Sequence, residues 1–108
     1  MSVAITNNSG ATVTLNSLVV NWIDEPENQR ITAVSLVGPI WAGINNNSPS
    51  TFGVAPYEFD DPLVNRQITD GSTATLVLNF EQAPLADGQY DLTATFDGCT
   101  VSQSGTLP

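Results

Sequence analysis

The sequence predicts an all-β fold, an antiparallel sandwich of about seven to nine short strands. Apolar and polar residues alternate along most of the chain, which is the period of a strand with one buried face. No long window keeps the 3.6-residue apolar stripe of an amphipathic helix, and turn residues recur about every 8–12 residues. A chain of 108 residues can bury one core, so residues 1–108 are expected to form a single domain.

The first quarter of the chain predicts two strands joined by a turn. Ser2–Thr6 alternates, and the Asn- and Gly-rich residues 7–10 favour a turn because Asn and Gly tolerate positive φ. Residues 11–23 are too long for one regular strand, and their apolar parity shifts near Asn16-Ser17. One extra residue at that point, a β-bulge, would produce the shift.

The middle of the chain is less regular. Residues 31–37 are expected to form a strand, Gly38-Pro39 breaks it, and residues 40–42 are expected to form a short strand. Residues 43–65 then predict a long loop, or a loop that holds one short edge strand. Because binding residues often lie on such loops, this segment is the first place to look for a site.

The C-terminal third has the clearest alternation. Strands are expected at residues 72–81, after an Asp70-Gly71 turn, and at residues 89–96. Asp97-Gly98 predicts a two-residue hairpin that pairs Phe96 with Cys99. The end of the chain, residues 104–108, resembles the start of a linker. The side chains expected to point inward are those of Ala74, Leu76, Leu78, Phe80, Tyr90, Leu92, Ala94 and Phe96.

Charge excludes several classes of function. Two arginines stand against eleven acidic residues, with no lysine and no histidine, which gives a net charge of −9. Binding of nucleic acid or of anionic membrane surfaces is not expected from so few cations. Triads and zinc sites that use histidine are impossible. No apolar run is long enough to span a membrane, and 108 residues can hardly enclose a catalytic cleft, so neither an enzyme nor a required cofactor is expected.

Six short segments carry a family resemblance. They are residues 5–10, 14–22, 38–43, 76–80, 88–92 and 96–101, which run from an Asn-Asn-Ser-Gly opening to a Phe-Asp-Gly-Cys hairpin. Together they resemble Ig-like modules of bacterial secreted and envelope proteins. The resemblance implies an Ig-like sandwich that serves as a structural, adhesive or pilus-like building block, and it implies no catalytic residues. The Thr-, Asn- and Ser-rich, lysine-free composition agrees with an extracellular or cell-surface location.

Aromatic residues suggest a first candidate site. Trp22 shares a face with apolar neighbours and is expected in the core. Two interpretations stay open for a second group, which consists of Trp41, Phe52, Tyr57 and Phe59. These rings could pack the long loop against the domain. Alternatively, they could stack on sugar faces, which would make the chain a carbohydrate-binding module.

Carboxylates suggest a second candidate site. Asp24, Glu25 and Glu27 form one acidic cluster, and Asp60 and Asp61 belong to another. Two such loops at one end of a sandwich could supply the six to eight oxygens that Ca²⁺ prefers. The alternative is that both clusters are solvated acidic loops without a metal.

The remaining candidates concern assembly. Val3 and Ile5 lie on one face of the first strand, which is followed by a Gly-containing turn. A strand next to such a turn could detach from its sheet, and a neighbouring molecule could then supply a strand in its place. The expected partners are therefore further copies of this chain or adjoining domains. Cys99, the one cysteine, is expected on the buried face with Phe96. The alternative for this thiol is an intermolecular disulfide.

Overall fold

The computed structural model describes residues 1–22, 29–47, 49–60, 62–82, 88–97 and 99–107. One 3-10 helix, η1 (Leu63–Arg66), accompanies the strands. The strands are β1 (Ser2–Thr6), β2 (Val13–Trp22), β3 (Ile31–Ser35), β4 (Pro39–Asn45), β5 (Ser50–Phe52), β6 (Gln67–Ile68), β7 (Thr73–Phe80), β8 (Gly88–Phe96) and β9 (Cys99–Leu107).

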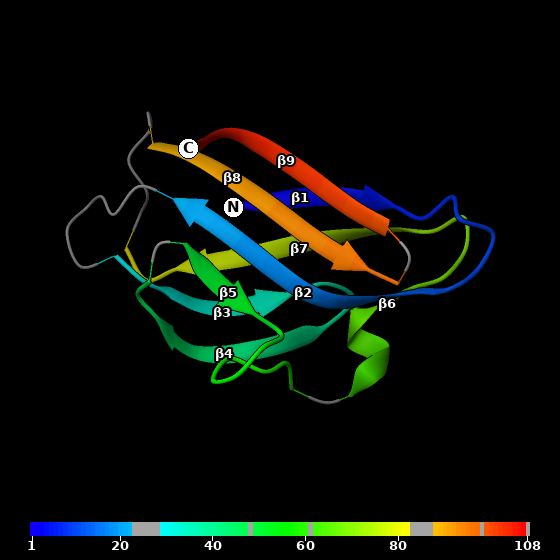
Figure 1. Cartoon of the computed structure of the whole chain (residues 1–108), viewed down its shortest axis with the longest axis horizontal. Coiled ribbons are helices and arrows are strands. Elements are labelled where there is room, and N and C mark those ends of the chain that lie inside the picture. Colours follow the sequence, from blue (N-terminus) through cyan, green and yellow to red (C-terminus); the bar gives the residue numbers. More distant parts are fainter. Residues whose placement is uncertain (23–28, 48, 61, 83–87, 98, 108) are drawn as a thin grey trace.

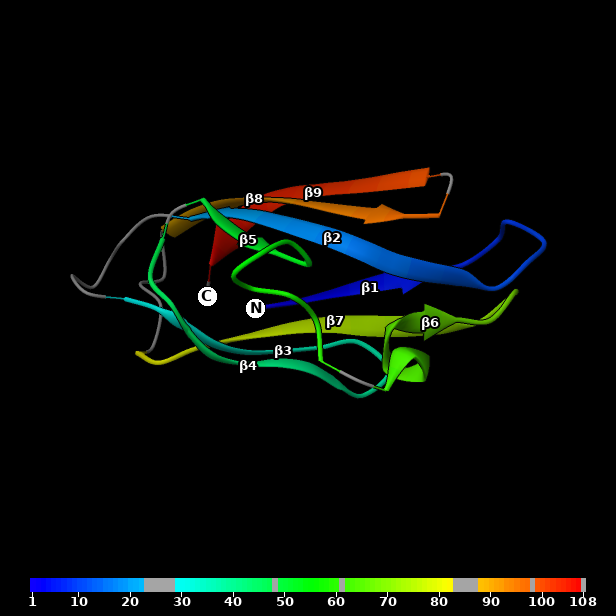
Figure 2. The same cartoon turned by 60° about the horizontal axis from the view of Figure 1, so that its bottom comes forward.

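These strands form two antiparallel sheets that pack as a β-sandwich, so the predicted fold class is confirmed. One sheet has the order β1-β7-β3-β4, and the other has the order β5-β2-β8-β9 with β6 paired to β2 (Figure 1). Figure 2 shows the two sheets as separate layers. Their facing side chains make the core, which includes Val3, Ile5, Val34, Ile40, Leu76 and Leu78 from one layer and Leu15, Leu18, Val20, Leu92, Ala94 and Phe96 from the other.

Strand β2 contains the predicted bulge. Its register against β8 shifts between Leu15 and Ser17, so that one residue of β2 has no opposite partner. Side chains alternate with period two, and one extra residue therefore keeps the apolar residues on both sides of the bulge inward. The buried residues of β2 are Val13, Leu15, Leu18, Val20 and Trp22.

Trp22 is a core residue, as predicted. It is 4% exposed, and its ring meets Phe80 edge to face with 5.5 Å between the ring centroids. Its indole Nε1 donates to Ser50 Oγ on β5 at 3.0 Å, which satisfies the polar end of a buried ring. Trp22 thus joins the end of β2 to strands of both layers.

The middle region agrees with the sequence prediction in part, because β5 is the short edge strand allowed within residues 43–65, and it departs from the prediction elsewhere. Strand β4 continues past residue 42 to Asn45, and its register against β3 shifts at two places. Strand β3 ends at Ser35, since residues 36–38 already form the turn into β4. Both η1 and the two-residue β6 lie in or just after the segment expected as loop, and neither is long enough to show a periodic pattern.

The end of the chain also departs from its prediction. Residues 104–107 belong to β9, which pairs with β8 along its whole length from Cys99 to Leu107. The hairpin register predicted from Asp97-Gly98 is confirmed, with Phe96 opposite Cys99. The prediction of a linker from residue 104 was therefore wrong, because the backbone there continues a strand whose sequence lacks apolar alternation.

Asn7 links the segment between β1 and β2 to β6 by hydrogen bonds. Its side chain is buried, and Nδ2 donates to the carbonyl oxygens of Ala11 and Ile68, each at 2.7 Å. Its Oδ1 accepts the backbone N–H of Ser9 at 3.0 Å. The turn after β1 is thereby held against the chain that leads into β7.

Replacing Asn7 should lower stability far more than replacing its neighbour. In Asn7→Ala the two carbonyls lose their donor, so the free energy of unfolding should fall by about 2–3 kcal/mol in urea titrations. Asn8→Ala is the control, because Asn8 is exposed and its replacement should change stability by less than about 0.5 kcal/mol. Equal losses in the two variants would contradict the role given to Asn7.

Candidate functional site

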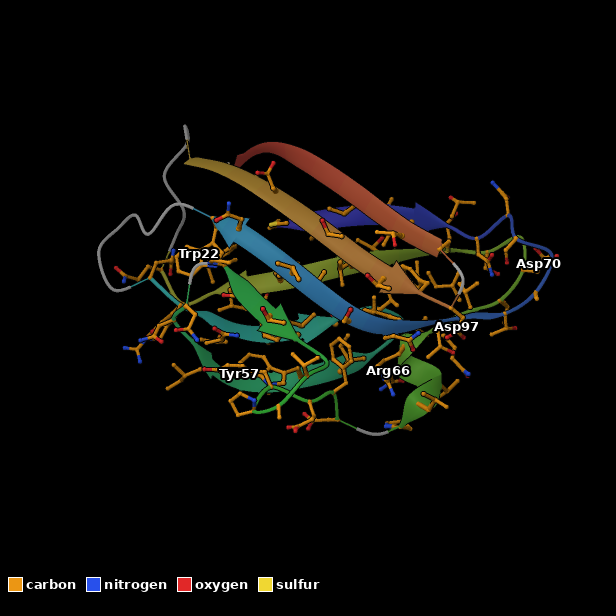
Figure 3. The ribbon with its side chains drawn as sticks, viewed as in Figure 1. Trp22, Tyr57, Arg66, Asp70 and Asp97 are labelled. Atoms are coloured by element: carbon orange, nitrogen blue, oxygen red, sulfur yellow. The ribbon has the colours of Figure 1, made fainter. Side chains whose placement is uncertain are left out.

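The sandwich has two unlike sides, each bounded by one edge strand from either sheet. Strands β4 and β5 border one side, and β1 and β9 border the other (Figure 1). Figure 3 shows Tyr57 and Arg66 along the β4–β5 side, whereas Trp22 lies at one end of the sandwich and Asp70 and Asp97 lie toward the other end. Each side holds some of the residues that the sequence predicted as candidates.

An aromatic cluster closes the β4–β5 side. Trp41 from β4, Phe52 from β5 and Tyr57 from the loop after β5 meet in edge-to-face geometry, with ring centroids 4.8 to 6.3 Å apart. Trp41 is 7% exposed and Phe52 is fully buried, while Tyr57 is half-buried. Such contacts fix the loop against both layers, since aromatic pairs of this geometry add attraction beyond their buried area.

Phe59 and Arg66 extend this closure toward the bulge in β2. The Arg66 guanidinium lies 5.2 Å from the centroid of the Phe59 ring, a cation–π geometry. Its Nη1 donates to the carbonyl oxygen of Leu15 at 2.8 Å, at the first residue of the bulge. Arg66 therefore supplies a donor to a strand carbonyl at the point where the sheet register shifts.

The four predicted ligand-binding aromatic residues therefore lie on one side of the fold, mostly as packing residues. Because Trp41 and Phe52 are buried, neither ring offers a free face to a sugar. Tyr57 and Phe59 are half-buried and pack against the core. This burial favours the interpretation in which the rings pack the loop against the domain.

Of the five predicted calcium ligands, the structure describes only Asp60. Asp24, Glu25, Glu27 and Asp61 lie outside the described residues. Asp60 is exposed, and its backbone N–H donates to the carbonyl oxygen of Ile40 at 2.7 Å. Within the part of the chain that the structure describes, no three acidic or cysteine side chains gather as a metal site. Calcium binding therefore stays a prediction.

The β1–β9 side is open. Among the described strands, β1 pairs with β7 alone and β9 pairs with β8 alone, so each has one unpaired edge. Between them lies a hollow of about 150 Å³, here called the notch, whose walls include Ile5, Val13, Phe96 and Cys99. The predicted assembly residues Val3 and Ile5 face the core beside this notch.

Cys99 corrects one prediction. It was expected to be buried with Phe96, but its side chain is exposed. The parity argument placed it on the correct face, since Cys99 and Phe96 both line the notch. The argument failed because the space between β1 and the β8–β9 hairpin is left unfilled, and solvent reaches the thiol.

The two open edges lack the features that usually prevent strands from pairing with other molecules. Neither β1 nor β9 contains a charged residue or a proline, and β9 is nine residues long. By contrast, β4 begins with Pro39, and β5 has only three residues. The sequence prediction missed the importance of β9, although the absence of charge and proline from residues 99–107 is visible in the sequence.

A larger hollow of about 400 Å³ lies elsewhere, between η1 and the start of β7. Its walls include Val37, Val64, Ile68 and Thr73, and none of its lining residues is acidic, basic or a thiol. Such a lining supplies neither an acid–base pair nor a nucleophilic thiol.

Comparison of the sequence and the structure with protein-family models, curated proteins and solved structures finds no match. Within the described residues, the structure has no helix of the length and apolar character needed to cross a membrane.

Gly53 provides a test of the closed side. Its φ is +87°, and a Cβ there would overlap the Asn16 carbonyl oxygen and lie 2.8 Å from Cε2 of Phe59. Gly53→Ala should therefore lower the free energy of unfolding by about 3 kcal/mol or more in urea titrations.

Gly10→Ala is the matched control for this substitution. Gly10 has nearly the same φ, +90°, and a Cβ at this residue would meet no atom within 4 Å. Only the backbone contribution of about 1–2 kcal/mol should be lost there. If both variants lose the same stability, the close approach of residue 53 to the β2 bulge is not a real constraint.

Proposed function

We propose that this chain is a non-catalytic structural or adhesive module of the extracellular space or a bacterial cell surface. In this role it is a building block that joins other copies or adjoining domains by strand addition. The observation that carries the proposal is the pair of unprotected edges, β1 and β9, on one side of the sandwich. An unpaired strand edge presents a row of N–H and C=O groups to which another extended chain can add.

The distribution of charge supports assembly through these edges. All eleven acidic residues lie outside β1 and β9. A strand that pairs with either edge therefore meets no carboxylate on that strand. The net charge of −9 repels distant copies, which opposes uncontrolled aggregation without blocking the edges themselves.

The pairing order supports an Ig-like form of the sandwich. Strands β2, β8 and β9 pair in the order of the C, F and G strands of an immunoglobulin domain. Strands β1, β7 and β3 would then take the places of B, E and D. Trp22 on β2 agrees with the buried tryptophan of strand C. In this assignment β4, β5 and β6 are additions, and no described strand takes the place of A.

Carbohydrate binding, with or without calcium, is the alternative function. Its support is weaker because two of its four rings, Trp41 and Phe52, are buried. A non-catalytic role is supported by the lining of the larger hollow, which carries no acid, base or thiol.

Light scattering at rising protein concentration tests the proposed function. The mean mass should increase with concentration and should increase further when salt is added, because salt screens the repulsion between acidic copies. A strict monomer up to about 1 mM would contradict the proposal, since even an association free energy of about 4 kcal/mol is visible at that concentration.

A glycan panel and a chelator test the alternative. Tryptophan fluorescence should stay unchanged with every glycan, because Trp41 and Trp22 are both buried. The melting temperature should be the same in calcium and in EDTA. A fluorescence shift with one glycan, or a lower melting temperature in EDTA, would instead favour the binding module.

A further inference from the structure

We propose that two copies of this chain pair through β9, antiparallel and across a two-fold axis, so that their β8–β9 sheets become one continuous sheet. The inference rests on the proposed function and names its partner, which is a second copy, and its surface, which is the open edge of β9. An interface of this kind is isologous, because both copies contribute the same strand.

Length favours β9 over the other edges. Strand β9 has nine residues, all paired on one side with β8, whereas β1 has five. Every additional residue pair contributes backbone hydrogen bonds to an added strand, so the longer edge gives the more stable junction. Strand β4 is bent by two register shifts against β3, which makes its edge a poor template.

The backbone of β8 shows which groups of β9 are free. The N–H of Asp97, next after β8, donates to the Thr14 carbonyl oxygen in β2 at 3.2 Å. The N–H and C=O groups of successive residues point to opposite edges of a strand. In β8, those of the odd-numbered residues therefore point toward β2, and those of the even-numbered residues point toward β9. Phe96 and Cys99, which lie opposite each other, are then a pair joined by backbone hydrogen bonds. In β9, the N–H and C=O groups of the odd-numbered residues therefore point toward β8. The outward-facing backbone groups belong to Thr100, Ser102, Ser104 and Thr106.

This alternation restricts the register between two copies. Across a two-fold axis, outward-facing residues must lie opposite outward-facing residues, so even numbers pair with even numbers. The register that uses all nine residues places Gln103 opposite Gln103 of the second copy. Ser102 then lies opposite Ser104, and Thr100 lies opposite Thr106. No pair brings two charges together.

The register also assigns a place to Cys99. It lies opposite Leu107 of the second copy, so the two Cys99 positions are eight residues apart along the paired strands. That separation is about 27 Å, far beyond the reach of a disulfide. The association should therefore persist unchanged in a reducing buffer, and the native thiol is not the link between copies.

Disulfide trapping tests the register. In a Cys99→Ser background, Gln103→Cys should form a covalent dimer under mild oxidation. The two residues would form a non-hydrogen-bonded pair with about 4.5 Å between Cα atoms, which is within the range for a disulfide. Thr100→Cys is the matched control. Thr100 is exposed, and its two copies would be about 20 Å apart, so no covalent dimer should form.

Proline substitution tests the edge. Ser102→Pro removes an N–H that faces away from β8, so its dimer dissociation constant should rise at least about tenfold. At a protein concentration where the unmodified chain is also monomeric, the two melting temperatures should be the same. Gln103→Pro removes an N–H that faces β8, and it should lower the melting temperature instead. This contrast separates loss of the interface from loss of the fold.

The outcomes distinguish the inference from the proposed function. If copies associate but Ser102→Pro has no effect, or Thr100→Cys cross-links as well as Gln103→Cys, the β9 pairing is wrong and another edge, such as β1, joins the modules. If the unmodified chain is a monomer at every concentration, both the inference and the proposed function fail.

Discussion

The extra residue in β2 is the constraint on which the rest of the structure depends. Among the described strands, β2 alone pairs with three others, β5, β6 and β8. At the bulge, β2 makes hydrogen bonds to two residues that lie far away in sequence. The Leu15 carbonyl accepts from Arg66, and the Asn16 side chain donates to Asp97 Oδ1 at 2.8 Å. A strand without the bulge would turn Leu18, Val20 and Trp22 outward.

The bulge also makes the two sides of the sandwich unequal. Arg66, at the end of η1, donates to the Leu15 carbonyl oxygen, and Gly53 lies close to the Asn16 carbonyl oxygen. Because of these contacts, η1 and the loop after β5 pack against β2 and close the β4–β5 side. No comparable segment covers β1 and β9 among the described residues. The rings for which the sequence left both loop packing and sugar binding open are packed on this side, and the two open strand edges lie on the opposite side.

Local sequence was enough to predict features that depend on alternation and turn chemistry. Ser2–Thr6, the shift near Asn16 and the pairing of Phe96 with Cys99 each follow from residues close together in the chain. Features that depend on contacts between residues far apart in the chain could not be predicted. The parity of Cys99 was clear, but its exposure depends on whether β1 packs closely against the hairpin, and it does not. Similarly, β6 is a strand because Val13 and Thr14 lie beside it.

In the proposed assembly, the unequal lengths of the two open edges would limit its size. Pairing β9 with β9 across a two-fold axis would occupy the longest open edge of both copies. The result would be a closed dimer, with no free β9 edge for a third copy. Further growth would have to use β1, whose five residues offer about half as many backbone pairs. Pairing of β9 with β1 of the next copy would instead be head-to-tail and could continue into a filament. The difference in length between the two edges therefore favours a side-by-side junction between two chains over open-ended growth.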